Sequence, residues 1–261
     1  MSIITLTTDF GTDSPYAAAM KGVILSINPA VTLVDISHAI PAQDVGRGAL
    51  VLEDTTPWFP ADTIHVAVVD PGVGTERSIL YARIGRQQYL APDNGLLSRL
   101  MARTPPTEVL RLAEPEFWLE PVSSTFHGRD IMAPVAARLS LGLDPHRLGP
   151  PAEQLTRLDL PEARFIERKI RGQVIEIDSF GNIITNITGG MFAGQPTDSR
   201  LCIVCGIYET FGLYRTYADQ PEGMLVALVG SSGRVELAIV GNNAAEKLGV
   251  SIGTPVIVAW E

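Results

Sequence analysis

The stretch TIHVAVVD, residues 63–70, decides the fold of the first half of this chain. It is an apolar run without regular alternation of apolar and polar side chains. Such a run is typical of a strand in a parallel sheet whose two faces are both covered. It ends in Asp70, and the glycines of the PGVG segment that follows, residues 71–74, indicate a turn. We therefore predict a buried strand that delivers a carboxylate to a loop.

Strand-like and helix-like segments alternate on both sides of this stretch. Short β-rich runs indicate strands, and segments with helical composition or an apolar stripe indicate helices. The alternation predicts an α/β fold with an open, mostly parallel sheet and flanking helices. The predicted strands are residues 3–10, 31–37 and 63–70, and the predicted helices are residues 14–28, 46–59, 93–103 and 129–142.

The carboxy-terminal part of the chain differs in composition and in the predicted pattern of secondary structure. Residues 143–165 are rich in proline and charge, which is typical of a linker or a covering segment. After Lys169 short strands and turns follow one another, with one helical segment at 243–249, and this pattern predicts a small β-barrel. The predicted domains are an α/β domain at residues 1–150, a linker at 151–168 and a smaller carboxy-terminal β-barrel domain at 169–261.

The composition argues against several classes of function. The chain has 261 residues, of which 46% are hydrophobic, and a formal net charge of −9. Because Lys and Arg are not clustered, the chain lacks the basic face of a nucleic-acid binder. No run approaches the roughly 18 apolar residues of a membrane span, and the amino terminus does not resemble a signal peptide. We expect a cytoplasmic protein that binds neither nucleic acid nor a membrane.

The two cysteines, Cys202 and Cys205 in RLCIVCG, have the spacing of a zinc or redox motif. A structural zinc site needs further ligands at a similar spacing, and the chain has no second pair of this kind. Both cysteines lie in an apolar, β-like run. Buried reduced thiols are therefore the preferred interpretation, and they fit a reducing compartment.

Carboxylates follow two of the predicted strands. Asp9 lies at the end of the first strand and Asp70 at the end of the apolar strand, and glycine follows each within a turn. Ligands of parallel α/β sheets bind at the carboxyl ends of strands, so both are candidate site residues. Asp93 and Asn94 stand before a predicted helix, where Asp93 is better explained as an N-cap.

One arginine and one histidine complete the candidates in this half. Arg77 comes shortly after the aspartate of the apolar strand and is near enough to fold back over the turn, although alone it is typical of a surface arginine. His127 lies at a loop-to-helix junction and is a candidate general base. The other histidines, His38, His65 and His146, have less supportive surroundings.

Two further segments in the second half carry candidate residues. In DSFGNIITNI, the side chains of Asp178, Phe180 and Asn182 come from one turn, and together they can stack a base and hold polar groups. A hairpin with a packed Phe180 explains the same pattern equally well. In GSSGRVELA, a serine-glycine turn precedes Glu236, which is a candidate site residue. The alternative interpretation is that Glu236 faces solvent in an ordinary hairpin.

Taken together, these segments resemble one known family, the S-adenosyl-L-methionine (SAM) hydroxide adenosyltransferases, also called adenosyl-forming SAM hydrolases. Each motif alone is common, but their order along almost the whole chain is specific. The motifs that carry the resemblance are TTDFG (7–11), VVDPGVGTER (68–77), APDNG (91–95), STFHGRD (124–130), DSFGNIITNI (178–187) and GSSGRVELA (230–238).

The resemblance implies attack of water or hydroxide on C5′ of SAM, which releases adenosine and L-methionine without a metal or a cofactor. It also implies a homotrimer in which the first domain of one subunit meets the second domain of its neighbour at each SAM site. The implied catalytic residues are Asp70, Arg77 and His127. The implied substrate-binding residues are Asp9 at the ribose, Asp178 and Asn182 at the methionine end, and Asp70, Phe180, Ser231 and Glu236 elsewhere along the site.

Three alternatives remain open at this stage. The related fluorinase and chlorinase carry tyrosine at the position of His127, and the fluorinase has serine at the position of Gly128, so this chain favours water over halide. A non-catalytic SAM or adenosine sensor is the second alternative. The third is a metal-dependent phosphohydrolase built on Asp9, Asp70, Asp93 and His127, although Arg77 beside a divalent cation would be electrostatically unfavourable.

Overall fold

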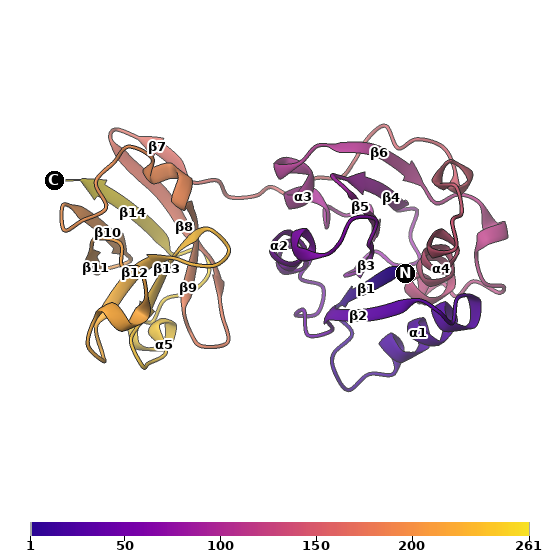
Figure 1. The fold of residues 1–261 in the computed structure, drawn as a ribbon, viewed down its shortest axis with the longest axis horizontal. Coiled ribbons are helices and arrows are strands. Elements are labelled where there is room, and N and C mark those ends of the chain that lie inside the picture. Colours follow the sequence, from indigo (N-terminus) through magenta and orange to yellow (C-terminus); the bar gives the residue numbers. More distant parts are fainter. Residues whose placement is uncertain (1, 261) are drawn as a thin grey trace. The chain divides into compact units, whose positions relative to one another are not determined.

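The computed structural model describes residues 2–260 of the chain. The chain divides into two compact units, Met1–Asp159 and Leu160–Glu261, which Figure 1 shows. Among the described residues, no helix combines the length and the apolar character that crossing a bilayer demands.

A 6-stranded sheet forms the centre of the first unit. Four of its strands, β2, β1, β3 and β5, run parallel, whereas β4 is antiparallel to both of its neighbours. The mostly parallel α/β fold expected from the sequence is therefore confirmed. The strands are β1 (Ile3–Thr8), β2 (Thr32–Ser37), β3 (Ile64–Val68), β4 (Ile79–Ile84), β5 (Gln87–Pro92) and β6 (Pro106–Arg111), in the order β2-β1-β3-β5-β4-β6.

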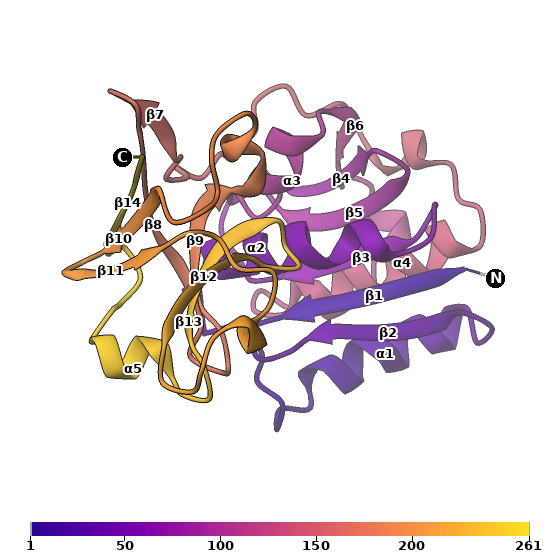
Figure 2. The same cartoon turned by 60° about the vertical axis from the view of Figure 1, so that its left-hand side comes forward.

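Helices cover both faces of this sheet (Figures 1 and 2). Two apolar cores result, one on each side. The first core lies under α1 (Tyr16–Ile27) and α4 (Ala133–Ser140), and the second lies under α2 (Val45–Thr55) and α3 (Ser98–Arg103).

Strand β3 and the residue that follows it contribute side chains to both cores. Val66 and Val68 belong to the first core, and Ala67 and Val69 belong to the second. Neither face of this strand meets water, which is why residues 63–70 show no polar alternation.

The order of the strands reverses in the sheet. Strand β1 lies between β2 and β3, so the chain leaves β1 toward one side and returns on the other. In α/β sheets, ligands bind at the carboxyl ends of the strands beside such a reversal. Asp9 directly follows β1, and Asp70 lies just beyond β3.

The structure shortens two predicted helices. The segment 93–103 becomes a turn followed by α3, which starts only at Ser98. The segment 129–142 begins with a π-helical turn, Gly128–Met132, before α4. Pro134 explains the second difference: it has no N–H, so the regular ladder of hydrogen bonds is interrupted, and Ala133 N–H donates to the Gly128 carbonyl instead.

Strands β4, β5 and β6 were not predicted from the sequence. The first two form a tight hairpin in which Ile84 pairs with Gln87. Gly85 takes the left-handed conformation, φ +59°, that such a short connection requires.

The second unit is a nearly closed, barrel-like antiparallel sheet, as expected. Its strand order is β11-β10-β14-β8-β9-β13-β12, with β7 paired to β8. Tyr214, just after β11, bridges to Leu228 on β12, which draws the two ends of the sheet together. The elements are β7 (Arg164–Ile166), β8 (Lys169–Ile177), β9 (Ile183–Thr188), β10 (Leu201–Cys205), β11 (Tyr208–Phe211), β12 (Leu225–Val229), β13 (Arg234–Ile239), α5 (Ala244–Leu248) and β14 (Pro255–Trp260).

Both cysteines lie on β10 and neither forms a disulfide. Cys205 is buried, and desolvation raises the pKa of its thiol to about 11, so it stays protonated. Cys202 is only half-buried, which corrects the prediction that both thiols are buried. The remaining short turns are 3₁₀-helical: η1 (Thr56–Trp58), η2 (Pro115–Phe117), η4 (Pro145–Leu148), η5 (Gly189–Phe192) and η6 (Tyr217–Asp219).

Candidate active site

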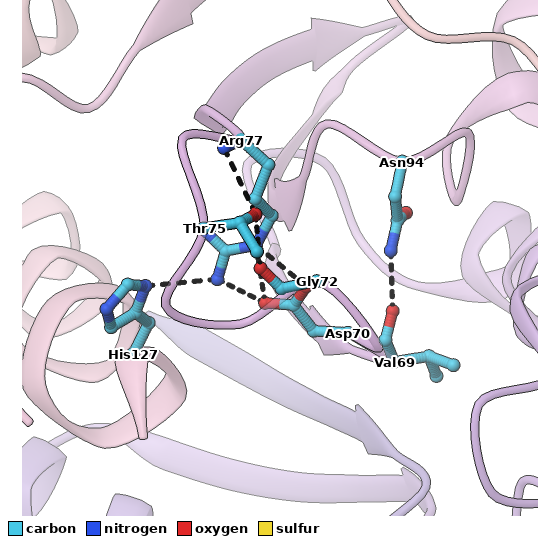
Figure 3. A network of polar contacts seen from close by, with 7 residues as sticks. All are labelled: Val69, Asp70, Gly72, Thr75, Arg77, Asn94 and His127. Carbon is cyan, nitrogen blue, oxygen red and sulfur yellow. Dashed lines mark hydrogen bonds and ion pairs between the residues drawn. The ribbon is translucent and has the colours of Figure 1, made fainter. Parts of the chain in front are cut away.

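Arg77 contacts both Asp70 and His127 at the carboxyl edge of β3 (Figure 3). Arg77 Nε lies 2.7 Å and 2.8 Å from the two Asp70 carboxylate oxygens, and Arg77 Nη2 also pairs with Asp70. The same Nη2 donates to His127 Nδ1 over 3.0 Å. The side chains of Arg77 and Asp70 are only 9% and 4% exposed, so their charges face each other with little water between them.

The turn after Asp70 is shaped so that Arg77 folds back. Thr75 donates from its backbone N–H and from its hydroxyl to the Gly72 carbonyl. Gly74 has φ +80°, and a Cβ atom there would lie 2.3 Å from the Ser124 carbonyl oxygen. Only glycine permits this approach, and it brings the turn against the segment that carries His127.

His127 precedes the π-helical turn and is held by close packing. A Cβ atom at Gly128 would lie 3.2 Å from Met20 Sδ and 3.3 Å from Val68 methyl groups, so the backbone beside His127 rests directly on α1 and β3. Asp130, which is 1% exposed, accepts from the Ser123 N–H and fixes the loop before His127. The sequence reasoning did not single out Asp130.

The contact with Arg77 determines which nitrogen of His127 carries the proton. A guanidinium group only donates hydrogen bonds, so His127 Nδ1 must accept and the neutral ring carries its proton on Nε2. Burial, and next the charge of Arg77, lower the pKa of His127, outweighing the opposite effect of Asp70 and Asp130. His127 is therefore a neutral hydrogen-bond donor through Nε2 at physiological pH.

Asp9 stands at the end of β1 with one carboxylate oxygen already placed. Its Oδ2 accepts from the Gln43 N–H over 2.8 Å, and Gln43 adopts φ +65°, which is uncommon for a residue with a side chain. No other residue of the described chain hydrogen-bonds the Asp9 carboxylate. Oδ1 is thus available to a ligand.

The prediction that Asp93 caps a helix is wrong. Asp93 Oδ1 accepts from the Thr156 N–H, and α3 begins later without a side-chain cap. Its neighbour Asn94 donates to the Val69 carbonyl over 2.8 Å, as Figure 3 shows, and so ties this turn to the end of β3. The sequence reasoning passed over Asn94, although an Asn-Gly pair before a helix indicates a structured turn.

A cavity of about 380 Å³ opens beside Arg77 and His127. Asp70 is not part of its wall, so the cavity lies on the guanidinium and imidazole side of the group. It gives water a place next to both side chains. The other lining residues are mostly apolar: Ser78, Ile79, Arg111, Leu112, Ala113, Trp118, Val122 and Ile131.

The second unit holds a larger pocket of about 850 Å³, large enough for a nucleoside-sized ligand. All the candidate residues of this half line it: Asp178, Phe180, Asn182, Ser231 and Glu236.

The DSFGN turn presents its aromatic ring outward. Asp178 Oδ1 accepts from the N–H groups of Phe180 and Asn182, and its Oδ2 accepts from Asn182 Nδ2. Phe180 is 78% exposed, so the alternative of a packed phenylalanine is wrong for this unit. The turn is a hairpin, but one that offers a ring face to a ligand.

Glu236 is buried, so the interpretation of Glu236 as a solvent-facing hairpin residue is wrong. It is 8% exposed on β13, and the Tyr217 hydroxyl donates to its Oε1 over 2.5 Å. Burial raises the pKa of Glu236, and Asp178 adds to this against the opposing hydrogen bond from Tyr217. Tyr217 lines the same pocket and was missed, because one tyrosine in a polar loop carries no distinctive pattern.

The residues of the phosphohydrolase alternative do not form one cluster. Asp70 is engaged by Arg77, Asp9 by Gln43 and Asp93 by Thr156. Across residues 2–260, no group of three or more His, Cys, Asp or Glu side chains is arranged to hold a metal ion.

Comparison with known proteins covers both units. Residues 4–149 match the SAM hydroxide adenosyltransferase N-terminal domain, and residues 172–257 match the SAM hydroxide adenosyltransferase C-terminal domain. The (R)-S-adenosyl-L-methionine hydrolase of Thermus thermophilus is 39% identical, over 95% of this chain and 96% of that protein. A fluorinase of Nocardia brasiliensis is 28% identical over 97% of both chains. The crystal structure of an uncharacterized conserved protein from Thermotoga maritima superposes with a TM-score of 0.92 at 31% identity, covering 99% of this chain and 100% of that one.

Proposed function

This chain belongs to the SAM hydroxide adenosyltransferase family, and from that membership we propose that it hydrolyses SAM to adenosine and L-methionine. The observation that carries the proposal is the contact of Asp70, Arg77 and His127 beside a cavity at the carboxyl edge of the sheet. Water that has lost a proton to bulk solvent attacks C5′ of SAM there as hydroxide. The new C5′–O bond forms as the C5′–S bond breaks, the electron pair stays on sulfur, and the oxygen keeps its remaining proton.

The chemistry needs little from the protein beyond aiming the water. The leaving group is a neutral thioether, so no general acid is required. Arg77 and His127 Nε2–H both donate hydrogen bonds to the hydroxide oxygen, and its third lone pair points toward C5′. His127 acts as an orienting donor in this arrangement, since its one ring lone pair is engaged by Arg77.

The charge of the site suits a cationic substrate. Asp70 neutralises Arg77, so the sulfonium ion of SAM does not meet an uncompensated positive charge. As attack proceeds, the positive charge on sulfur disappears, and a pocket with little water favours that loss of charge.

The remaining contacts to SAM follow from the candidate residues. Asp9 Oδ1 accepts from the ribose hydroxyls, and Asp70 also contacts the substrate. Phe180 stacks on the ligand, with Ser231 and Glu236 beside it. Asp178 and Asn182 hold the amino-acid end of the methionine, a role that rests on the family resemblance and on their shared pocket.

We also propose a homotrimer in which each SAM site combines the first unit of one subunit with the second unit of a neighbour. Two observations support this assembly. The candidate residues divide between the two units, and the ring of Phe180 is exposed at the pocket of the second unit, where a neighbouring subunit can cover it. The family resemblance supplies the trimer itself.

The deciding experiment is incubation of the purified protein with SAM, followed by chromatography for adenosine and methionine, with and without EDTA. Equal amounts of both products, unaffected by EDTA, are expected. Activity lost in EDTA and restored by Mg²⁺ or Mn²⁺ would favour the phosphohydrolase alternative, and tight SAM binding without products would favour a sensor.

A halogenase is the second candidate function, because fluorinases are among the relatives. His127 in place of the tyrosine of those enzymes argues for water. Adding chloride or fluoride to the SAM incubation tests this. Formation of 5′-chloro- or 5′-fluoro-5′-deoxyadenosine would overturn the preference for water.

A further inference from the structure

A chain of polar side chains adjoins the turn that carries Asp9. Thr8 Oγ1 lies 2.9 Å from His38 Nδ1. His38 Nε2 lies 3.1 Å from Asp35 Oδ1 in a close but poorly aligned contact. Lys21 Nζ donates to Asp35 Oδ2 over 2.5 Å. The mechanism above uses none of these four residues.

The Asp35 end of this chain is anionic. Asp35 is a carboxylate: burial works to raise its pKa, but Lys21 and His38 hold that pKa below its usual value. His38 Nε2 faces this acceptor, and on the other side of the ring Nδ1 shares one hydrogen bond with the Thr8 hydroxyl, whose donor is set by the tautomer of the ring. The Thr8 oxygen in turn accepts from the Phe10 N–H over 3.3 Å.

His38 therefore forms hydrogen bonds at both ends of the turn that carries Asp9. Its side chain holds Thr8, and its backbone carbonyl accepts from the Gly11 N–H over 2.8 Å. Thr8 is fully buried and the His38 side chain is 12% exposed, so water does not compete for these bonds. On its other side, the Asp9 carboxylate is held by the Gln43 N–H.

We propose that His38 is a positioning residue for SAM binding, which fixes Asp9 against the ribose hydroxyls through Thr8 and Gly11, with Asp35 and Lys21 orienting its ring. This rests on the proposed function, in which Asp9 is the ribose contact. A binding carboxylate gains affinity when its backbone is already held in the bound geometry, because less ordering is then required on binding.

The test is a double-mutant cycle on adenosine affinity, measured by calorimetry. Thr8→Val removes the hydroxyl at constant volume, and we expect roughly tenfold weaker adenosine binding, the size of one lost buried hydrogen bond. In the Asp9→Ala background the same substitution should cost nothing further, because its effect passes through Asp9.

Thr7→Val is the matched control. Thr7 lies on the same strand and its hydroxyl is buried without a hydrogen-bond partner among the described residues, so adenosine affinity should not change. At His38, His38→Ala should raise KM for SAM with kcat retained, and His38→Asn, whose amide can accept from or donate to the Thr8 hydroxyl, should recover part of the loss. A merely structural role would lower kcat and melting temperature together.

The inference is overturned if Thr8→Val binds adenosine like Thr7→Val, or if the Thr8 and Asp9 penalties simply add. Adenosine binding does not require turnover. A wild-type protein that fails to split SAM would therefore refute the proposed function and leave the cycle to decide on His38.

Discussion

At the scale of single residues, the pair Asp70–Arg77 couples catalysis to stability. Both side chains are almost fully buried and each neutralises the other. Arg77→Ala leaves Asp70 as an unpaired buried charge, which typically costs about 3–5 kcal/mol of folding free energy. Chemical denaturation should show this loss, and Asp70→Asn combined with Arg77→Ala should recover most of it. If the single variant Arg77→Ala and the double variant Asp70→Asn/Arg77→Ala are equally stable, the pair is not buried in solution.

The role of His127 is tested by comparing two substitutions at the same position. His127→Ala should lower kcat by about 10²–10³-fold, the usual effect of removing one placed hydrogen-bond donor, while SAM affinity changes little. His127→Gln can still accept from Arg77 and donate to water, but it cannot take up a proton. We expect His127→Gln to keep part of the activity in steady-state assays.

A general base at His127 would give a different pattern. Both variants would then lose activity to the same extent, because neither alanine nor glutamine accepts a proton. That result would transfer the proton-accepting role to the imidazole and would require it to release Arg77 during the reaction.

At the scale of elements, the catalytic contact depends on how closely two loops approach. Gly74→Ala places a methyl group against the Ser124 carbonyl and strains a left-handed backbone. We expect kcat to fall steeply, because the turn carrying Arg77 must move away from the His127 loop. Gly142→Ala is the matched control: it has φ +94° but open space around it, so it should cost only about 1–2 kcal/mol of stability, with kcat retained. Similar kcat values would show that the loop approach is not critical.

The elements also show what the sequence could and could not reveal. The buried strand at residues 63–70 was predictable because its apolar run has a direct physical cause. The β4–β5 hairpin was missed although a Gly85-Arg86 pair between two β-rich runs indicates it. The helix predicted from residue 93 failed because Asn94 Oδ1 accepts from the Leu96 N–H and closes a turn, which composition cannot distinguish from a helix start.

The site itself was beyond what periodicity can predict. Arg77 and His127 are separated by 50 positions and meet only through the packing of two loops. Their joint role was available only from the resemblance of the whole motif series. His38 was set aside for the same reason: its contact with Thr8 exists only once β1 and β2 lie side by side.

At the scale of the whole molecule, the division of candidate residues between two units makes a prediction about assembly. If each site combines units of two neighbouring subunits, His127→Ala and Asp178→Ala damage opposite halves of a site. A mixed trimer then contains sites in which the first unit comes from an Asp178→Ala subunit and the second from a His127→Ala subunit. Such a site has no damaged residue. With random mixing, about a quarter of all sites should be intact.

The measurement is SAM hydrolysis after the two inactive variants are unfolded together and refolded, with each variant refolded alone as the control. Recovery of activity only in the mixture supports shared sites, and the recovered fraction reports how the subunits mix. Light scattering on the same samples gives the oligomeric state. If the mixture stays as inactive as its components while trimers form, each site must be built within one subunit, because damage in either half then inactivates every site that carries it.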